Sequence, residues 1–151
     1  MKLSSKPIAA AKKVLIYGAP KTGKTRLFGS LAKHFKLVDI DIENGWETLA
    51  HSIPDEYKDN VEIISLPDTR SFPIAIETCL KIIRGTPVDI CEEHGKVGCS
   101  VCKKDNKPFV SLELNALGPE YVVCFDSLTQ LTNSAIAHIT KGKPDDYKLI
   151  S

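Results

Sequence analysis

The chain carries almost no net charge, and it has no long apolar run. Its 20 Lys and Arg residues nearly balance 19 Asp and Glu, so the formal net charge is +1. No overall field therefore draws the chain toward nucleic acid, and any such binding needs a local patch of charge. Every apolar run is much shorter than the roughly 20 residues of a membrane-spanning helix. The composition thus predicts a protein that does not cross a membrane.

The sequence also lacks a secretory signal and a disulfide framework. The apolar stretch near the N-terminus is short and is ended by Lys12 and Lys13, so it has no signal-peptide core. Without such a signal the chain is expected to stay inside the cell, where five cysteines remain reduced. Internal repeats and low-complexity tracts are absent as well. Cytoplasmic localisation is the expectation.

The length and composition are those of one globular domain. The chain has 151 residues, of which 42% are hydrophobic and 26% are charged. We expect residues 1–12 to form a leader and residues 13–85 and 119–151 to form the core. Residues 86–118 are rich in Cys, Gly, Lys and Asp and are expected to be an insertion into that core.

The most specific feature is the segment GAPKTGKT, which matches the phosphate-binding pattern G-x-x-x-x-G-K-[ST]. In this P-loop pattern, glycines allow successive backbone N–H groups to point at phosphate oxygens. The lysine supplies positive charge to the β- and γ-phosphates, and the Thr hydroxyl is a ligand for Mg²⁺. The alternative is a flexible Gly/Lys turn on the surface. The predicted nucleotide-binding residues are Gly18, Ala19, Pro20, Lys21, Thr22, Gly23, Lys24 and Thr25.

Apolar patterning predicts strands that alternate with helices. Short apolar runs bounded by turn residues indicate strands, and apolar residues at helical spacing indicate helices. The alternation favours an α/β fold with a parallel sheet whose faces are both covered. Ligands of such sheets bind at the carboxyl ends of the strands. Strands are expected at 14–17, 36–42, 61–66 and 121–125, with a hairpin strand at 110–114, and helices at 24–35, 46–52, 72–84 and 128–140.

Acidic residues follow two of the predicted strands. Asp126 ends the strand 121–125, where it can hold Mg²⁺ beside Thr25, although it could also cap the next helix, as could Ser127. Glu43 lies beyond the strand 36–42, where a carboxylate can orient the water that attacks the γ-phosphate. The alternative for Glu43 is a surface turn residue in Glu-Asn-Gly.

Two further carboxylates make the assignment of Glu43 less direct. Strand alternation sends Asp39 and Asp41 to one face, and Glu43 has the same parity. Glu43 is chosen because it lies nearest the end of the strand. The predicted catalytic residues are therefore Lys24, Glu43 and Asp126.

These segments together resemble the RecA/RadA-like P-loop ATPases. The resemblance is carried by Ile40-Asp41-Ile42-Glu43, by Leu66-Pro67-Asp68-Thr69 with the amphipathic helix that follows, and by Val122 to Ser127, in that order. The stretch from Ile16 to Trp46 is most similar to phage-encoded nucleotide-binding proteins, the Sak-type single-strand annealing ATPases.

The resemblance covers about residues 13–85 and 120–140 and has several implications. It implies a RecA-like sheet, a catalytic Glu43, a Walker B Asp126, assembly into homo-oligomers and action on single-stranded DNA in a bacterial host cell. The family has further strands after the Walker B helix, so the chain is expected to be truncated at its C-terminus. The family lacks the insertion at 86–118.

The insertion contains four residues suited to tetrahedral Zn²⁺. Cys91, His94, Cys99 and Cys102 form C-x₂-H-x₄-C-x₂-C, two short ligand pairs with glycines between them. Four protein ligands leave no open position, so the predicted zinc is structural. The alternative is a polar loop with a reduced or redox-active Cys-x-x-Cys. Nearby lysines could touch a nucleic-acid backbone, but solvated side chains explain them as well.

The predicted function is a Mg²⁺-dependent, RecA-like ATPase with the cofactors ATP, Mg²⁺ and structural Zn²⁺, serving DNA recombination or single-strand annealing. One alternative is a nucleotide-binding but inactive fragment that acts as an interaction module. Another is a small P-loop kinase, although the sequence shows no Arg-rich lid. A GTPase would need an Asn/Thr-Lys-x-Asp motif after a strand, which is absent.

Overall fold

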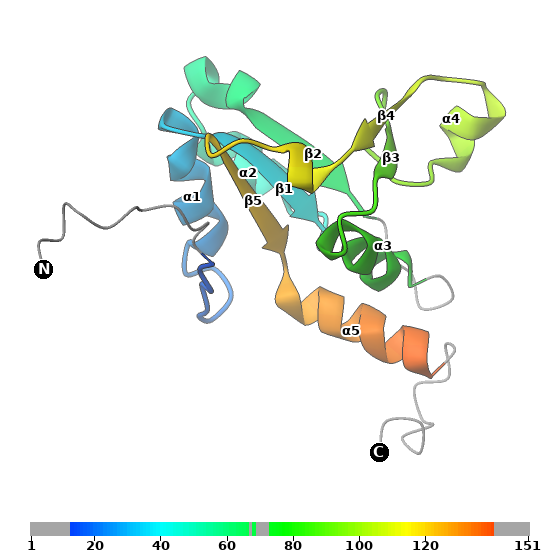
Figure 1. The fold of residues 1–151 in the computed structure, drawn as a ribbon. Helices are drawn as coiled ribbons and strands as arrows, with labels where there is room; N and C mark the ends of the chain where they lie inside the picture. The colour runs from blue at the N-terminus through cyan, green and yellow to red at the C-terminus, as the bar shows by residue number, and fades with distance from the viewer. Residues whose placement is uncertain (1–12, 67, 69–72, 141–151) are drawn as a thin grey trace, which may run out of the picture.

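A computed structural model describes residues 13–66, 68 and 73–140 (Figure 1). The chain alternates strands with helices in this part, as expected for an α/β protein. The expected leader 1–12, the first residue of the expected helix 72–84 and residues 141–151 lie outside it. The elements are α1 (Lys24–Gly29), β1 (Lys36–Asp41), α2 (Trp46–Ser52), β2 (Val61–Ser65), α3 (Ile74–Ile83), β3 (Val88–Cys91), α4 (Ser100–Lys104), β4 (Phe109–Leu112), β5 (Tyr121–Asp126) and α5 (Leu128–Ile139), with 3₁₀ turns at Ser30–Lys33, Asp55–Asn60 and Leu114–Ala116.

Three of the strands form a parallel sheet in the order β2-β1-β5. β1 is the central strand, and its residues 37–41 are all buried. Its alternation sends side chains to two separate apolar clusters. One lies toward α1 and α2 and the other toward α3, and Figure 1 shows α1 and α3 on either side of the strands. The first cluster is formed by Phe28, Ala32, Leu37, Leu49 and Ile53.

The expected strand at 14–17 is wrong. Residues 13–17 form no strand, and Val14, Leu15 and Tyr17 expose 70% or more of their surface. An apolar run becomes a strand only where a neighbour supplies hydrogen-bond partners, because an isolated strand leaves its backbone groups in water. Among the described residues β5 pairs only with β1, so this run does not extend the sheet. The helix expected at 24–35 is also shorter and continues as a 3₁₀ turn.

The other expected elements are present with small shifts at their ends. The strand β3 is an addition, since its short run Val88–Cys91 was not predicted. β3 pairs antiparallel with β4. The alternating pattern of the sequence had predicted β4 as one strand of a hairpin, and β3 is the other. Val88, Ile90 and Leu112 pack in the same apolar cluster as the sheet. The insertion is therefore anchored in the main core.

The turn after β3 runs along the outer edge of β2. The backbone N–H of Ser65 donates to the carbonyl of Gly95 at 2.7 Å, and Ser65 and Lys96 form a parallel bridge. Gly95 has φ +60°, and a Cβ atom there would lie 2.7 Å from the carbonyl oxygen of Ile63. The close approach and the left-handed backbone both require glycine at this position.

We expect Gly95→Ala to lower the free energy of unfolding by more than about 1–2 kcal/mol, because the left-handed backbone alone has a cost of that order. The clash with the Ile63 carbonyl adds to it. Gly45→Ala is the matched control, since Gly45 has φ −92° and open space around its Cβ position. Urea titration measures both variants. Equal stability of the two would contradict the close approach of the turn to β2.

Candidate functional site

The P-loop segment folds into a tight turn in front of α1. Gly23 has φ +88°, which agrees with the need for glycine there. A Cβ atom on Gly18 would lie 3.0 Å from the Thr22 hydroxyl, which itself donates to the carbonyl of Ala19 at 2.8 Å. The side chain of Lys24 reaches back across the loop, and its Nζ donates to the carbonyls of Gly18 and Ala19 at 3.1 and 3.0 Å. The lysine ammonium is thereby held within the bend.

A hydrogen bond joins the end of the loop to the sheet. Thr25 Oγ1 donates to Asp126 Oδ2 at 2.9 Å, between residues 101 positions apart in the sequence. The sequence predicts these two residues side by side as Mg²⁺ ligands. Asp126 does not cap α5, because the side chain of Ser127 accepts from the N–H of Gln130. Ser127 therefore caps α5, which is the alternative role that the sequence offered for it.

Glu43 lies exposed between β1 and α2. It follows the end of β1, at the same edge of the sheet as Asp126, which the register of β1 and β5 pairs with Asp41. The two oxygens of Asp41 accept from the N–H groups of Gly45 and Trp46 at 2.9 and 3.1 Å. Asp41 therefore holds the start of α2, while Glu43 remains in contact with solvent.

Asp39 was not predicted as a site residue, although strand alternation places it on the same face as Asp41. Asp39 is only 2% exposed, and its Oδ1 atom lacks a hydrogen-bond partner among the described residues. Burial is the main cause and the nearby carboxylates of Asp41 and Asp126 are the lesser ones that together raise the pKa of Asp39 to about 7. The pKa of Cys124, which lies opposite Asp39 in the sheet, is raised to about 12, mainly by burial. Carboxylates thus gather on one face of β1 and β5 below the loop.

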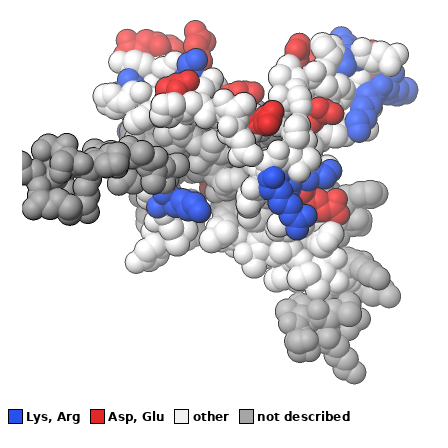
Figure 2. All heavy atoms as spheres, in the orientation of Figure 1, with Lys and Arg blue, Asp and Glu red and all other residues white. Residues whose placement is uncertain are grey.

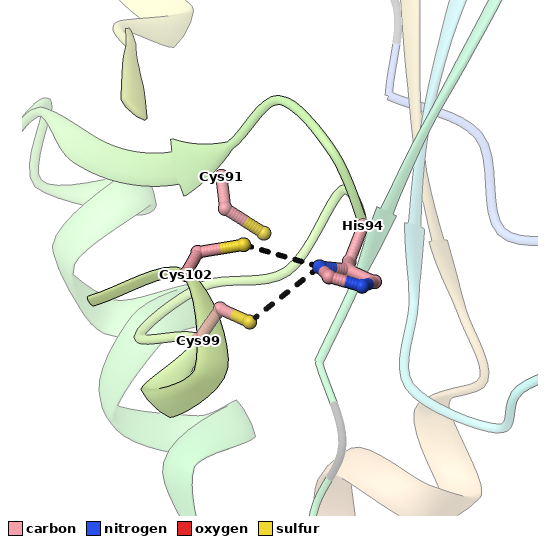
Figure 3. A group of neighbouring side chains, drawn as sticks. All are labelled: Cys91, His94, Cys99 and Cys102. Carbon is pink, nitrogen blue, oxygen red and sulfur yellow. Dashed lines mark hydrogen bonds between the residues drawn. The ribbon is translucent and has the colours of Figure 1, made fainter. Parts of the chain in front are cut away.

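The second candidate site is a cluster of four potential metal ligands in the insertion. Figure 3 shows the side chains of Cys91, His94, Cys99 and Cys102 pointing toward one another, and their ligand atoms all lie within 4.8 Å of each other. Tetrahedral zinc, with bonds of ~2.0–2.3 Å, would separate its ligands by about 3.3–3.8 Å. The four residues are therefore close enough to bind a metal ion.

Local backbone geometry brings the four ligands together. Cys91 ends β3, Cys99 precedes α4, and Cys102 lies within α4. His94 Nδ1 lies 3.1 Å from Cys102 Sγ and 3.8 Å from Cys99 Sγ, so this ring nitrogen faces the thiols. The N–H of Lys96 donates to Cys91 Sγ at 3.4 Å. Donor set and spacing both suit a metal of the zinc class.

The thiols differ in how readily they ionise without metal. A hydrogen bond with the backbone of Cys102 lowers the pKa of the Cys99 thiol. Burial, with the neighbouring Cys99 and Cys91, raises the pKa of Cys102 to about 12. Because a metal binds thiolates, its binding must release protons from this cluster.

The surface around the cluster carries charges of both signs, because Lys103, Lys104 and Lys107 lie in the same lobe as Glu92, Glu93 and Asp105. Figure 2 shows basic and acidic side chains together on the lobe that carries α4, at the end of the molecule away from α1. Lys107 lies 3.5 Å from Glu93 in an exposed ion pair, which contributes little to stability. A hollow of about 620 Å³ separates this lobe from α3 and α5, and Glu77, Lys96 and His138 line it. It lies beside Cys99 and away from the P-loop.

Comparisons of the chain with models of known protein families, with curated proteins and with solved structures found no match. None of the helices in the described part of the chain is long and apolar enough to span a membrane.

The raised pKa of Asp39 predicts a pH-dependent stability difference. The folded protein binds the Asp39 proton up to about pH 7 and the unfolded chain only up to about pH 4, so stability falls as the pH rises through this window. Three pKa units correspond to at most about 4 kcal/mol. Asp39→Asn, which cannot ionise, should therefore be more stable than wild type at pH 8 and gain less at pH 5.5.

Urea unfolding of both proteins at the two pH values, without added Mg²⁺ and with zinc present throughout, measures this difference. Asp89→Asn, at an exposed position on β3, is the control and should show no such pH dependence. An equal effect of Asp39→Asn at both pH values would contradict the raised pKa.

Proposed function

We propose that the chain binds ATP with Mg²⁺ at residues 18–25 and hydrolyses it. The observation that carries this proposal is the hydrogen bond between Thr25 and Asp126. A Gly/Lys surface turn has no need of a carboxylate from a distant strand. A Mg²⁺-nucleotide site does, because the metal is held between the loop hydroxyl and an acid at a strand end.

Each residue of the site has a role in this reaction. Lys24 leaves the loop carbonyls and binds the β- and γ-phosphates together with the loop N–H groups. Thr25 and Asp126 hold Mg²⁺, directly or through water. Glu43 orients the attacking water, and its exposed position at the sheet edge leaves it accessible to the γ-phosphate side of the loop. The resemblance to RecA-like ATPases adds single-stranded DNA as the effector and a homo-oligomer as the active state.

We expect Lys24→Ala to weaken ATP binding by about tenfold or more, because the variant lacks the one positive charge held inside the loop. Isothermal calorimetry with Mg²⁺ and ATP measures the change. Lys33→Ala, at an exposed position after α1, is the matched control and should bind like wild type. ATP affinity of Lys24→Ala equal to that of wild type would refute the site.

The same preparations separate binding from hydrolysis. Glu43→Gln should bind ATP normally and lose turnover, measured as phosphate release with and without single-stranded DNA. If wild type binds ATP but releases no phosphate under either condition, the chain is a nucleotide-binding module without activity, as the alternative interpretation holds.

We further propose that the metal of the four-residue cluster is structural Zn²⁺. Three thiolates and one imidazole form a closed tetrahedral set that leaves no position for substrate. The insertion has little apolar surface of its own beyond its hairpin, so metal binding would supply much of the order of the turn along β2.

Purified protein is expected to contain one zinc per chain, and Cys99→Ser should lose most of it. Serine is a favourable residue before a helix, so the start of α4 is kept in this variant. Cys124→Ala, which changes a cysteine on β5, should retain the metal. Elemental analysis of the three proteins gives the result, and full zinc content in Cys99→Ser would exclude the ligand set.

A further inference from the structure

Asp39 is the one buried side chain whose polar atom lacks a partner in the part of the chain that the structure describes. Its Oδ1 atom faces the same side of β1 as Asp41, because residues two apart on a strand share a face. Burying an unpaired carboxylate has a cost of several kcal/mol unless a proton, a donor or a cation compensates it. A cation bound beside Asp39 would offset this cost whenever the carboxylate is ionised.

The neighbouring carboxylates differ in what they already bind. Asp41 uses both oxygens to accept from the backbone at the start of α2. Asp126 uses Oδ2 for the Thr25 hydroxyl. The hydroxyl donates its proton in this bond, so its lone pairs remain available to a cation. Asp39 and Asp126 can thus offer a cation the carboxylate oxygens that these hydrogen bonds leave unused.

The register of the sheet places these groups within reach of one ion. Asp41 lies opposite Asp126, and Asp39 lies opposite Cys124, one pair earlier on the same face. Diagonal neighbours on a sheet face are about 7–8 Å apart at the backbone, a span that two carboxylates can close around a cation. The charge of Asp126 also contributes to the raised pKa of Asp39, in keeping with their proximity.

We propose that Asp39, with Asp126 and Thr25, binds a divalent cation of the Mg²⁺ class before nucleotide arrives. This inference rests on the proposed function in taking Thr25 and Asp126 as the cation side of the nucleotide site. Mg²⁺ bound by one carboxylate commonly depends on substrate phosphates for its remaining charge neutralisation. A second carboxylate from Asp39 removes that dependence, so the empty protein already holds the ion.

Mn²⁺ is the probe, because it replaces Mg²⁺ at oxygen sites and its electron paramagnetic resonance signal is lost on binding. The full chain is titrated with Mn²⁺ in the absence of nucleotide, with zinc bound to the cysteine cluster. Wild type is expected to bind one Mn²⁺ per chain. Asp39→Asn should bind it at least about tenfold more weakly, since a ligating carboxylate becomes a neutral amide. Asp89→Asn should match wild type.

The outcomes separate this inference from the nucleotide proposal. If wild type binds no Mn²⁺ without nucleotide, or if Asp39→Asn binds it like wild type, the role of Asp39 is refuted. ATP binding by wild type and its loss in Lys24→Ala would then still stand. Conversely, one Mn²⁺ per chain that depends on Asp39, in a protein that fails to bind ATP, supports the cation site and refutes the nucleotide site. Circular dichroism of each variant checks that its fold is retained.

Discussion

The parallel pairing of β1 with β5 is the interaction on which both the core and the candidate nucleotide site depend. It sets Asp41 beside Asp126 at one edge of the sheet, and it brings Asp126 to the hydroxyl of Thr25 at the start of α1. The segments joined in this way are distant in the sequence, and long-range contacts of this kind require chain entropy to be lost before they form. The clusters on the two faces of the sheet supply the apolar burial that offsets that loss.

The insertion contributes to the fold at two places. Its hairpin adds apolar side chains to the larger core cluster, and its turn lies along the outer edge of β2 through Ser65 and Gly95. An uncovered strand edge is open to pairing with other chains, so this turn also protects the sheet. Because Cys91 precedes that turn and His94 lies within it, a metal ion bound by both would couple metal binding to protection of the edge. A structural metal here would stabilise both the edge of the sheet and the lobe that carries α4.

Asp39 shows how stability and a binding site oppose each other. Once ionised, a buried carboxylate without a partner destabilises the folded protein more than a neutral amide at the same position would. Features of this kind are common where a ligand later supplies the missing interaction. The opposite case is Asp41, whose oxygens are fully engaged by the backbone of α2. Two carboxylates on one strand face therefore have different roles, which the surrounding backbone decides.

The sequence by itself determined the local features. Apolar spacing located β1, α2, β2, α3, β5 and α5, because the periodicity of a strand or helix depends on neighbouring residues. The spacing of the four metal ligands identified the cluster, since each ligand pair spans a single turn. Only the tertiary structure decided that the apolar run 14–17 stays exposed, that Ser127 and not Asp126 caps α5, and that Asp39 is buried without a partner. Each of these outcomes depends on which distant segment lies alongside, and that information is absent from local sequence patterns.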